Sequence, residues 1–159
     1  MRTTILASTL ACSLALPALL GGALVLAPAI ADAAEQATCR IHAVEASQEG
    51  DGTIPKDLEF LREQLQAPEF TRYKGFRLLD AKDFQLELGT VVDQKFKSGH
   101  NVKLSLLGSK DGKLDFHTEL MRGGSSLINM DFSVKDGQLM LIPVRRGEQA
   151  IIFAYQCKK

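Results

Sequence analysis

The sequence predicts an α+β, mostly β domain: an antiparallel β-sandwich or flattened barrel of about 7–8 strands, with one α-helix after the first strand. Three observations predict this fold class. Apolar and polar residues alternate in most segments after residue 70, and turn-forming residues recur roughly every 8–14 residues beyond residue 80. Only one segment has helical periodicity, and strands joined by such short turns are expected to pair antiparallel.

Residues 1–33 have the layout of a bacterial secretory signal peptide. A single basic residue, Arg2, precedes a long apolar run that ends in small residues with an A-x-A cleavage pattern. An uncleaved membrane anchor is the alternative, because the run is long enough to span a bilayer. We expect cleavage, no stable membrane insertion afterwards, and a periplasmic or secreted protein. Residues 34–159 then form a single β-rich domain.

The first and last strands of this domain each carry a cysteine on the face expected to meet the core. Residues 38–46 predict the first strand, in which Cys39 shares a face with Ile41, and Cys157 shares a face with Phe153 in the last. Two cysteines in an exported domain predict a disulfide. Two free thiols or a metal-binding pair are the alternatives, but two cysteines alone do not make a zinc site.

A single helix is predicted near residues 54–66. Thr53 is expected to cap it, Pro55 suits the first turn, and Pro68 ends it. Three leucines at helical spacing form the stripe expected to be buried, namely Leu58, Leu61 and Leu65. The helix is therefore expected to cover one face of a sheet.

The rest of the chain alternates as strands do. Strand patterns occupy residues 70–80, 83–89, 91–96, 102–108, 114–121, 127–134, 139–144 and 150–157. Asp111–Gly112 predicts a hairpin turn, and Asp136–Gly137 predicts a second tight turn.

The candidate interaction surface lies in residues 70–77, where aromatic residues recur every third position and cations lie between them. Its residues are Phe70, Arg72, Tyr73, Lys74, Phe76 and Arg77. Aromatic and arginine side chains commonly anchor protein interfaces. The alternative, which we prefer for the rings, is that they fill the seam between the helix and the sheet.

Charge gives little indication of a site. The 19 basic and 19 acidic residues balance, so nucleic acid and anionic membranes are not expected partners. Two basic groups could form a local patch, although a solvated surface is preferred. These groups are Lys95, Lys97 and Lys103, and Arg145 with Arg146.

The sequence shows no arrangement typical of catalysis or metal binding, so no catalytic residue, metal or cofactor is expected. His117 lies between Asp115 and Glu119 on one strand face, but residues two apart along a strand do not converge easily on a metal. Ser125 and Ser126 follow two glycines, a pattern typical of a hairpin turn rather than a nucleophile elbow.

The segment IPKDLEFLREQLQAPEFTRYKGFRLL, residues 54–79, resembles a stretch found in a family of uncharacterised small exported bacterial β-rich proteins. The shared order is a signal peptide, a strand, a leucine-rich helix, an F-x-x-Y-x-x-F-x-L-L motif and then alternating strands. The resemblance implies export and a compact β domain, and no activity is assigned to the family.

The expected function is that of an exported, non-enzymatic binding or accessory module, with another exported protein as its partner. Core patterning throughout the domain and the lack of catalytic motifs in the sequence favour this function. One alternative is a carrier of a small apolar ligand, since a barrel of about eight strands can enclose one. A weaker alternative is a hydrolase of an unrecognised type.

Overall fold

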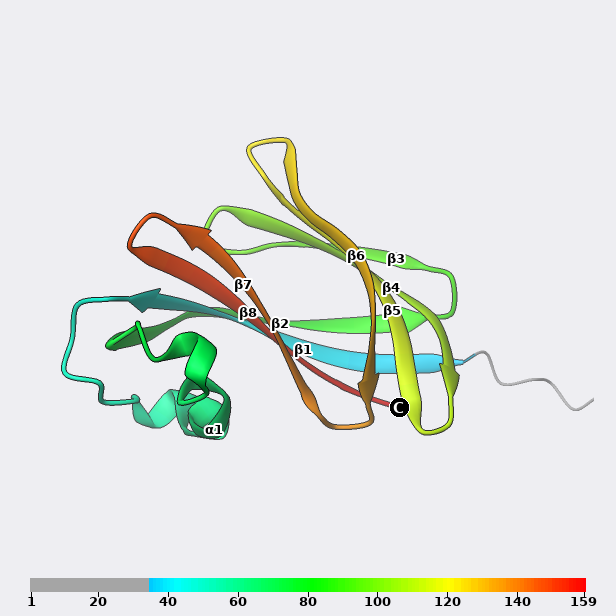
Figure 1. Cartoon of the computed structure of the whole chain (residues 1–159). Coiled ribbons are helices and arrows are strands. Elements are labelled where there is room, and N and C mark those ends of the chain that lie inside the picture. The colour runs from blue at the N-terminus through cyan, green and yellow to red at the C-terminus, as the bar shows by residue number, and fades with distance from the viewer. Residues whose placement is uncertain (1–34) are drawn as a thin grey trace, which may run out of the picture. The chain divides into compact units, whose positions relative to one another are not determined.

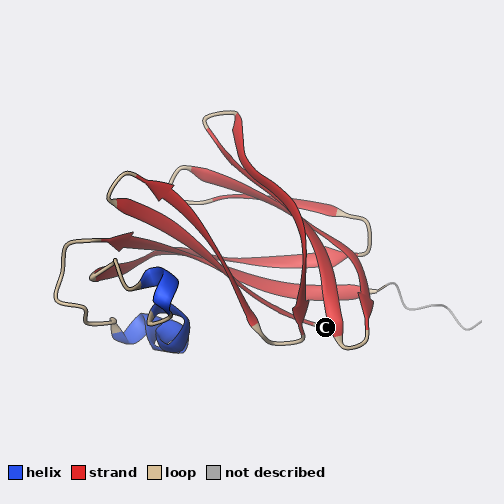
Figure 2. Ribbon diagram, viewed as in Figure 1, coloured by secondary structure: helices blue, strands red, loops and turns tan. Residues whose placement is uncertain are grey.

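Eight strands form two four-stranded sheets that face each other across an apolar core (Figures 1 and 2). The structure, a computed structural model, describes residues 35–159, so the signal peptide predicted at 1–33 lies outside the described residues. Each pair of neighbouring strands is antiparallel. The predicted mostly β sandwich is confirmed, and the two sheets do not join into a closed barrel.

The strands follow one another around the sandwich in chain order. Sheet A contains, in spatial order, β2 (Gly75–Glu87), β1 (Gln36–Ser47), β8 (Gln149–Lys158) and β7 (Leu139–Arg146). Sheet B contains β3 (Val91–Lys95), β4 (His100–Lys110), β5 (Lys113–Arg122) and β6 (Ser125–Lys135). Consecutive strands are neighbours except after β2 and after β6, where the chain passes from one sheet to the other.

The two predicted Asp-Gly turns have different roles. Asp111 and Gly112 both have positive φ, 53° and 72°, and they close the β4–β5 hairpin as predicted. Asp136–Gly137 also forms a tight turn, but it joins β6 of sheet B to β7 of sheet A. The expectation that strands joined by short turns always pair was therefore wrong here, because both strands cover the same core from opposite sides.

Three strands contain a bulge, and in each case the extra residue is a leucine. The register of β2 against β1 moves by one residue at Leu79, and similar shifts occur at Leu107 in β4 and Leu127 in β6. The sequence suggested two separate strands at 70–80 and 83–89, whereas β2 is continuous. Its charged middle still pairs with β1, where Arg40 binds Asp83 at 2.8 Å.

The predicted helix is shorter than expected and mostly of the 3₁₀ type. A 3₁₀-helix, η1 (Lys56–Leu61), leads into α1 (Arg62–Leu65), and a second 3₁₀ turn, η2 (Pro68–Phe70), follows. Thr53 does not cap the helix, because Pro55 occupies the N-cap position. The 3₁₀ geometry aligns residues three apart, which places Leu58 and Leu61 on one face. No helix within residues 35–159 is long and apolar enough to cross a membrane.

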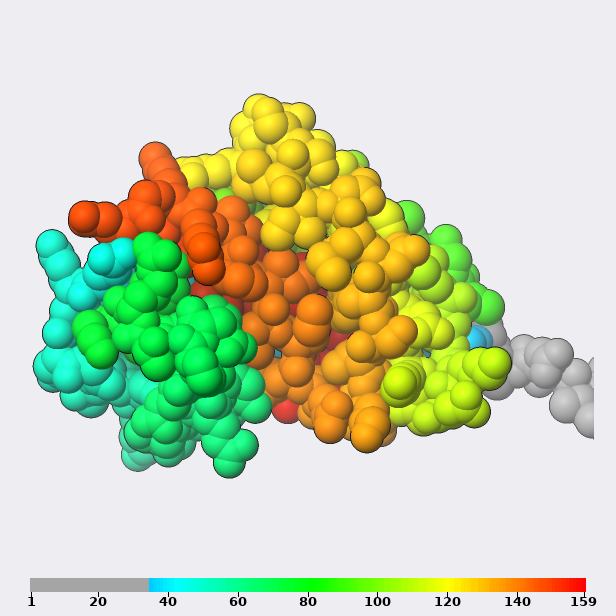
Figure 3. All heavy atoms as spheres, viewed as in Figure 1, coloured from blue at the N-terminus to red at the C-terminus, as the bar shows by residue number. Residues whose placement is uncertain are grey.

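Apolar side chains gather on both faces of sheet A. Rings and aliphatic chains from both sheets fill the space between them, including Phe84, Phe116, Phe153 and Tyr155. On the outer face, Val44 and Ile152 pack against the helical segment. That segment contributes the three predicted leucines, all buried, and it covers part of sheet A in the space-filling view (Figure 3). Sheet A is thus the central layer of the domain.

The predicted disulfide is present. Cys39 in β1 and Cys157 in β8 lie directly opposite each other, with their Cα atoms 4.1 Å apart, and both are fully buried. The bond links residues 118 positions apart in the sequence and joins the first strand to the last.

Candidate functional site

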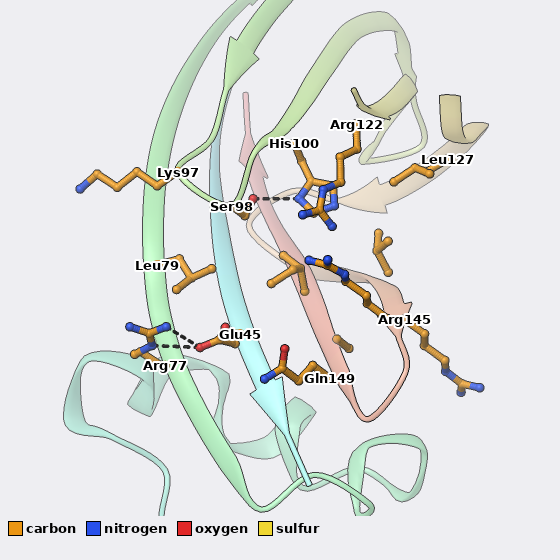
Figure 4. Close-up of a pocket in the computed structure, with 14 residues that line it drawn as sticks. Glu45, Arg77, Leu79, Lys97, Ser98, His100, Arg122, Leu127, Arg145 and Gln149 are labelled. Carbon is orange, nitrogen blue, oxygen red and sulfur yellow. Dashed lines mark hydrogen bonds and ion pairs between the residues drawn. The ribbon is translucent and has the colours of Figure 1, made fainter. Parts of the chain in front are cut away.

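The inward-facing side chains of most strands change from apolar to polar at one end of the sandwich. On β4 the inward series Leu104, Val102 ends in His100, and on β5 the inward Leu120 is followed by Arg122. His100 and Arg122 lie directly opposite each other in the sheet. The polar residues that end these inward series are Glu45, Arg77, His100, Arg122, Arg146 and Gln149. They line a hollow of about 450 Å³, called here the end pocket (Figure 4).

The end pocket opens where the two sheets separate. The ribbons of β6 and β7 meet at the turn that joins them and diverge toward the opposite end (Figure 1). Two of the three bulged residues, Leu79 and Leu127, line the pocket. Bulges redirect side chains and end regular pairing, and here they add apolar surface beside polar groups. Val144 and Ile151 extend that apolar surface.

Positive charge dominates the end pocket. Its cationic residues are Arg77, Lys97, Arg122, Arg145 and Arg146, and its one carboxylate is that of Glu45. Arg77 donates to Glu45 Oε2 from Nε at 3.0 Å and from Nη2 at 2.6 Å. The Lys97 amine points away from the centre of the pocket (Figure 4).

The remaining arginines have no such partner. Neither Arg122, Arg145 nor Arg146 forms an ion pair within residues 35–159. Arg122 and Arg146 belong to inward-facing series, on β5 and β7 respectively. Their two positive charges are therefore uncompensated inside a concave site, which is favourable for an anion.

His100 lies at the inner wall of the end pocket and is only 2% exposed. Its Nδ1 is 2.9 Å from Ser98 Oγ, and its ring meets Phe153 edge-on at 5.4 Å. Burial lowers the pKa of His100, and the nearby charges of Arg122 and Arg146 lower it further. The imidazole is therefore uncharged at neutral pH. A bound anion would offset the positive charges of the two arginines.

The candidate interaction residues of segment 70–77 do not lie together. Phe70 and Tyr73 are buried in the cluster beneath the helical segment, and Phe76 packs partly against it. This is the packing that we preferred for the rings. The cations separate as well, since Arg72 stacks over the Tyr73 ring at 5.3 Å and Arg77 reaches the end pocket. The third cation, Lys74, is exposed and lies outside that pocket.

From the sequence we preferred a solvated surface for the two basic groups. In the folded domain, the members of these groups lie in different places. Arg145, Arg146 and Lys97 line the end pocket, whereas Lys103 pairs with Glu119 at 3.0 Å on the outer face of sheet B. His100 and Arg122 were not singled out as site residues. Each of them continues the inward-facing series of its strand by one step beyond the last apolar residue. That pattern could have identified both residues from the sequence.

The other chemical candidates lie outside the end pocket. His117 pairs with Asp131 across two strands at 2.7 Å, on the outer face of sheet B. Within residues 35–159, no group of three or more His, Cys, Asp or Glu side chains is placed to hold a metal. Ser125 and Ser126 are exposed residues beside the β5–β6 hairpin turn.

The geometry therefore defines a small, concave, cationic site with an apolar side. Comparisons with protein-family models, curated proteins and solved structures find no match for this chain.

Proposed function

We propose that this chain is an exported, non-enzymatic binding module that holds an anionic group of its partner in the end pocket. The single observation that carries the proposal is the pair Arg122 and Arg146, which face a concave site without an ion-pair partner in residues 35–159. Arg122 is partly buried and Arg146 is exposed at the mouth of the site. Guanidinium groups are stabilised by a carboxylate or phosphate that accepts their hydrogen bonds. An anionic ligand would supply that missing acceptor.

The disulfide supports an extracytoplasmic location for this binding. Disulfides persist in oxidising compartments such as the periplasm and the extracellular space. The Cys39–Cys157 bond is compatible with either compartment. The partner is then another exported protein that presents an acidic group.

The carrier of an apolar ligand has less structural support. It required a closed barrel with an interior large enough for a ligand. The two sheets are not joined, and side chains such as Phe116, Phe153 and Tyr155 occupy the space between them. The end pocket is open and strongly cationic, which favours a charged ligand instead.

A hydrolase is the second candidate, and one contact favours it. Ser98 Oγ lies 2.9 Å from His100 Nδ1, as in a nucleophile and its general base. Against it, His100 forms no ion pair with a carboxylate within residues 35–159, so this part of the chain does not supply the third group that normally orients such a base. Turnover of an ester or phosphoester substrate that Ser98→Ala abolishes would replace the binding proposal with this one.

Partner capture tests the proposed function. The purified exported protein is immobilised and incubated with the exported proteins of the same organism, and a double variant, Arg122→Gln with Arg146→Gln, is compared with it. The control variant, Arg40→Gln with Arg62→Gln, removes two exposed arginines whose ion pairs lie outside the end pocket. We expect the pocket variant to lose the captured protein, the control to retain it, and added salt to weaken capture. Equal capture by both variants would contradict a role for the end pocket.

A further inference from the structure

The end pocket contains two kinds of surface side by side. Its lining includes the half-buried Arg122 and the exposed Arg146 together with His100, while Leu79, Leu127, Val144 and Ile151 provide apolar surface. Leu127 is 44% exposed, and as a bulge residue it is free of the regular pairing of β6. An inorganic anion would contact the cations and leave this apolar surface in water.

We propose that the end pocket binds a carboxylate attached to a short aliphatic group, with the carboxylate at Arg122 and Arg146 and the aliphatic group on Leu127. This inference rests on the proposed function and specifies the ligand of the same site. The chemistry is shared by the C-terminal carboxylate of a protein that ends in an aliphatic residue and by a free alkyl carboxylate.

The shape of the cationic groups and the apolar surface beside them favour a carboxylate on an organic group over an inorganic anion. The Arg77–Glu45 pair is neutral overall and occupies one wall of the pocket. The Lys97 amine points away from the centre of the pocket (Figure 4). The strand register places Arg122 and Arg146 in inward-facing series, near His100. A planar guanidinium can donate two parallel hydrogen bonds to the two oxygens of a carboxylate. A carboxylate on an aliphatic group also covers the apolar surface that an inorganic anion would leave in water.

Size favours a short apolar group. A hollow of about 450 Å³ lies at the lower end of the range for small-ligand sites, which is about 300–1,000 Å³. The packed core begins directly below, where Phe153 lies against the His100 ring. A long chain therefore has no route between the sheets, whereas one aliphatic side chain or a short alkyl chain fits at the edge.

Isothermal titration calorimetry of the exported protein tests the ligand class. The probes are octanoate, a hexapeptide ending in leucine, the same peptide with its C-terminus amidated, acetate, inorganic phosphate and octyltrimethylammonium. We expect octanoate, the free-acid peptide or both to bind at least tenfold more tightly than acetate or phosphate, and the amide and the cation not to bind. Binding of only one of the two carboxylate probes identifies the source and supports the inference equally.

Variants separate the two halves of the site. Arg122→Gln and Arg146→Gln should each weaken binding about tenfold, because each removes a charged hydrogen-bond donor. Leu127→Ser should weaken octanoate binding several-fold through lost apolar contact. The matched control is Leu107→Ser, which changes the bulge residue of β4, 49% exposed and outside the end pocket. Circular dichroism of each variant checks that the sandwich is intact.

The outcomes distinguish this inference from the proposed function. The aliphatic carboxylate is the wrong ligand if acetate and phosphate bind as tightly as octanoate. It is also wrong if the Leu127→Ser protein binds octanoate as tightly as the unchanged protein does. In both cases the proposed binding of an anion in the end pocket is still supported. If no anionic probe binds and the Arg122→Gln, Arg146→Gln protein still captures the same partner, both fail.

Discussion

Buried polar side chains in this domain differ in whether they have a hydrogen-bond partner. Tyr155 Oη lies 3.1 Å from Thr118 Oγ1 between the sheets, and burial raises the pKa of Tyr155 to about 12. His42 Nδ1 and Tyr73 Oη, by contrast, have no partner within residues 35–159. A buried group without a partner reduces stability, so the fold tolerates a cost beneath the helical segment.

The two buried histidines predict a stability that depends on pH. Burial lowers the pKa of both His42 and His100, and neighbouring arginines lower them further. The folded state therefore binds fewer protons than the unfolded state below the ordinary pKa of 6.5. We expect the free energy of unfolding to be highest above pH 6.5 and to decrease as pH falls below it, measured by urea denaturation between pH 7.5 and 5.

Replacing the histidines checks the origin of this slope. His42→Asn combined with His100→Asn should flatten the dependence of the free energy of unfolding on pH. His117→Asn changes a more exposed histidine on the outer face of sheet B and serves as the control. An unchanged slope in the double variant would show that other groups cause it.

Among the secondary-structure elements, the helical segment stabilises the domain through the three leucines that it buries, and not through the helix itself. Four residues are α-helical, and short isolated helices are marginal in water. The sequence predicted correctly that these leucines are buried, because apolar residues recur at helical spacing along the face that packs against a neighbouring element. It did not predict the 3₁₀ form, since that depends on how the segment fits against sheet A.

Truncating one of these leucines should destabilise the domain. Leu61→Ala removes a fully buried side chain and leaves a cavity against sheet A, so we expect the free energy of unfolding to fall by about 2–5 kcal/mol. Leu107→Ala, at a half-exposed bulge, should change it by less than about 1 kcal/mol. Urea denaturation of both proteins gives the comparison, and similar losses would contradict the packing described for Leu61.

At the scale of the whole molecule, the disulfide joins the ends of the described domain. Cys39 and Cys157 are opposite one another in the centre of sheet A, where β1 and β8 would otherwise depend on pairing between distant segments. Closing so long a loop restricts the unfolded chain strongly. The bond therefore stabilises the one strand pair of sheet A that joins the start of the domain to its end.

Removing the bond should cost much of the domain's stability. Cys39→Ala combined with Cys157→Ala should lower the free energy of unfolding by about 4–5 kcal/mol in the chain-entropy model. Net stabilities of small domains are about 5–15 kcal/mol, so this loss is a large fraction of the total and should lower the melting temperature by on the order of 20 °C. Thermal denaturation followed by circular dichroism measures this, with the oxidised protein as reference. An unchanged melting temperature would contradict the model.

The amino-acid sequence was sufficient to predict the features that depend on local patterns. Alternation identified the strands and the core-facing sides of both cysteines, and Asp111–Gly112 marked a hairpin, because side-chain direction and turn geometry follow from neighbouring residues. The choice between a sandwich and a barrel could not be predicted, because it depends on whether β6 pairs with β7 and β3 pairs with β2 in the folded domain.

The end pocket likewise required the tertiary structure. His100, Arg122 and Arg146 come from three strands, and each continues an inward-facing series that looks unremarkable in its own segment. Strand register and the separation of the sheets bring the ends of these series to one place. The sequence therefore specifies each strand and its inward face, while the association of distant strands creates the cationic site.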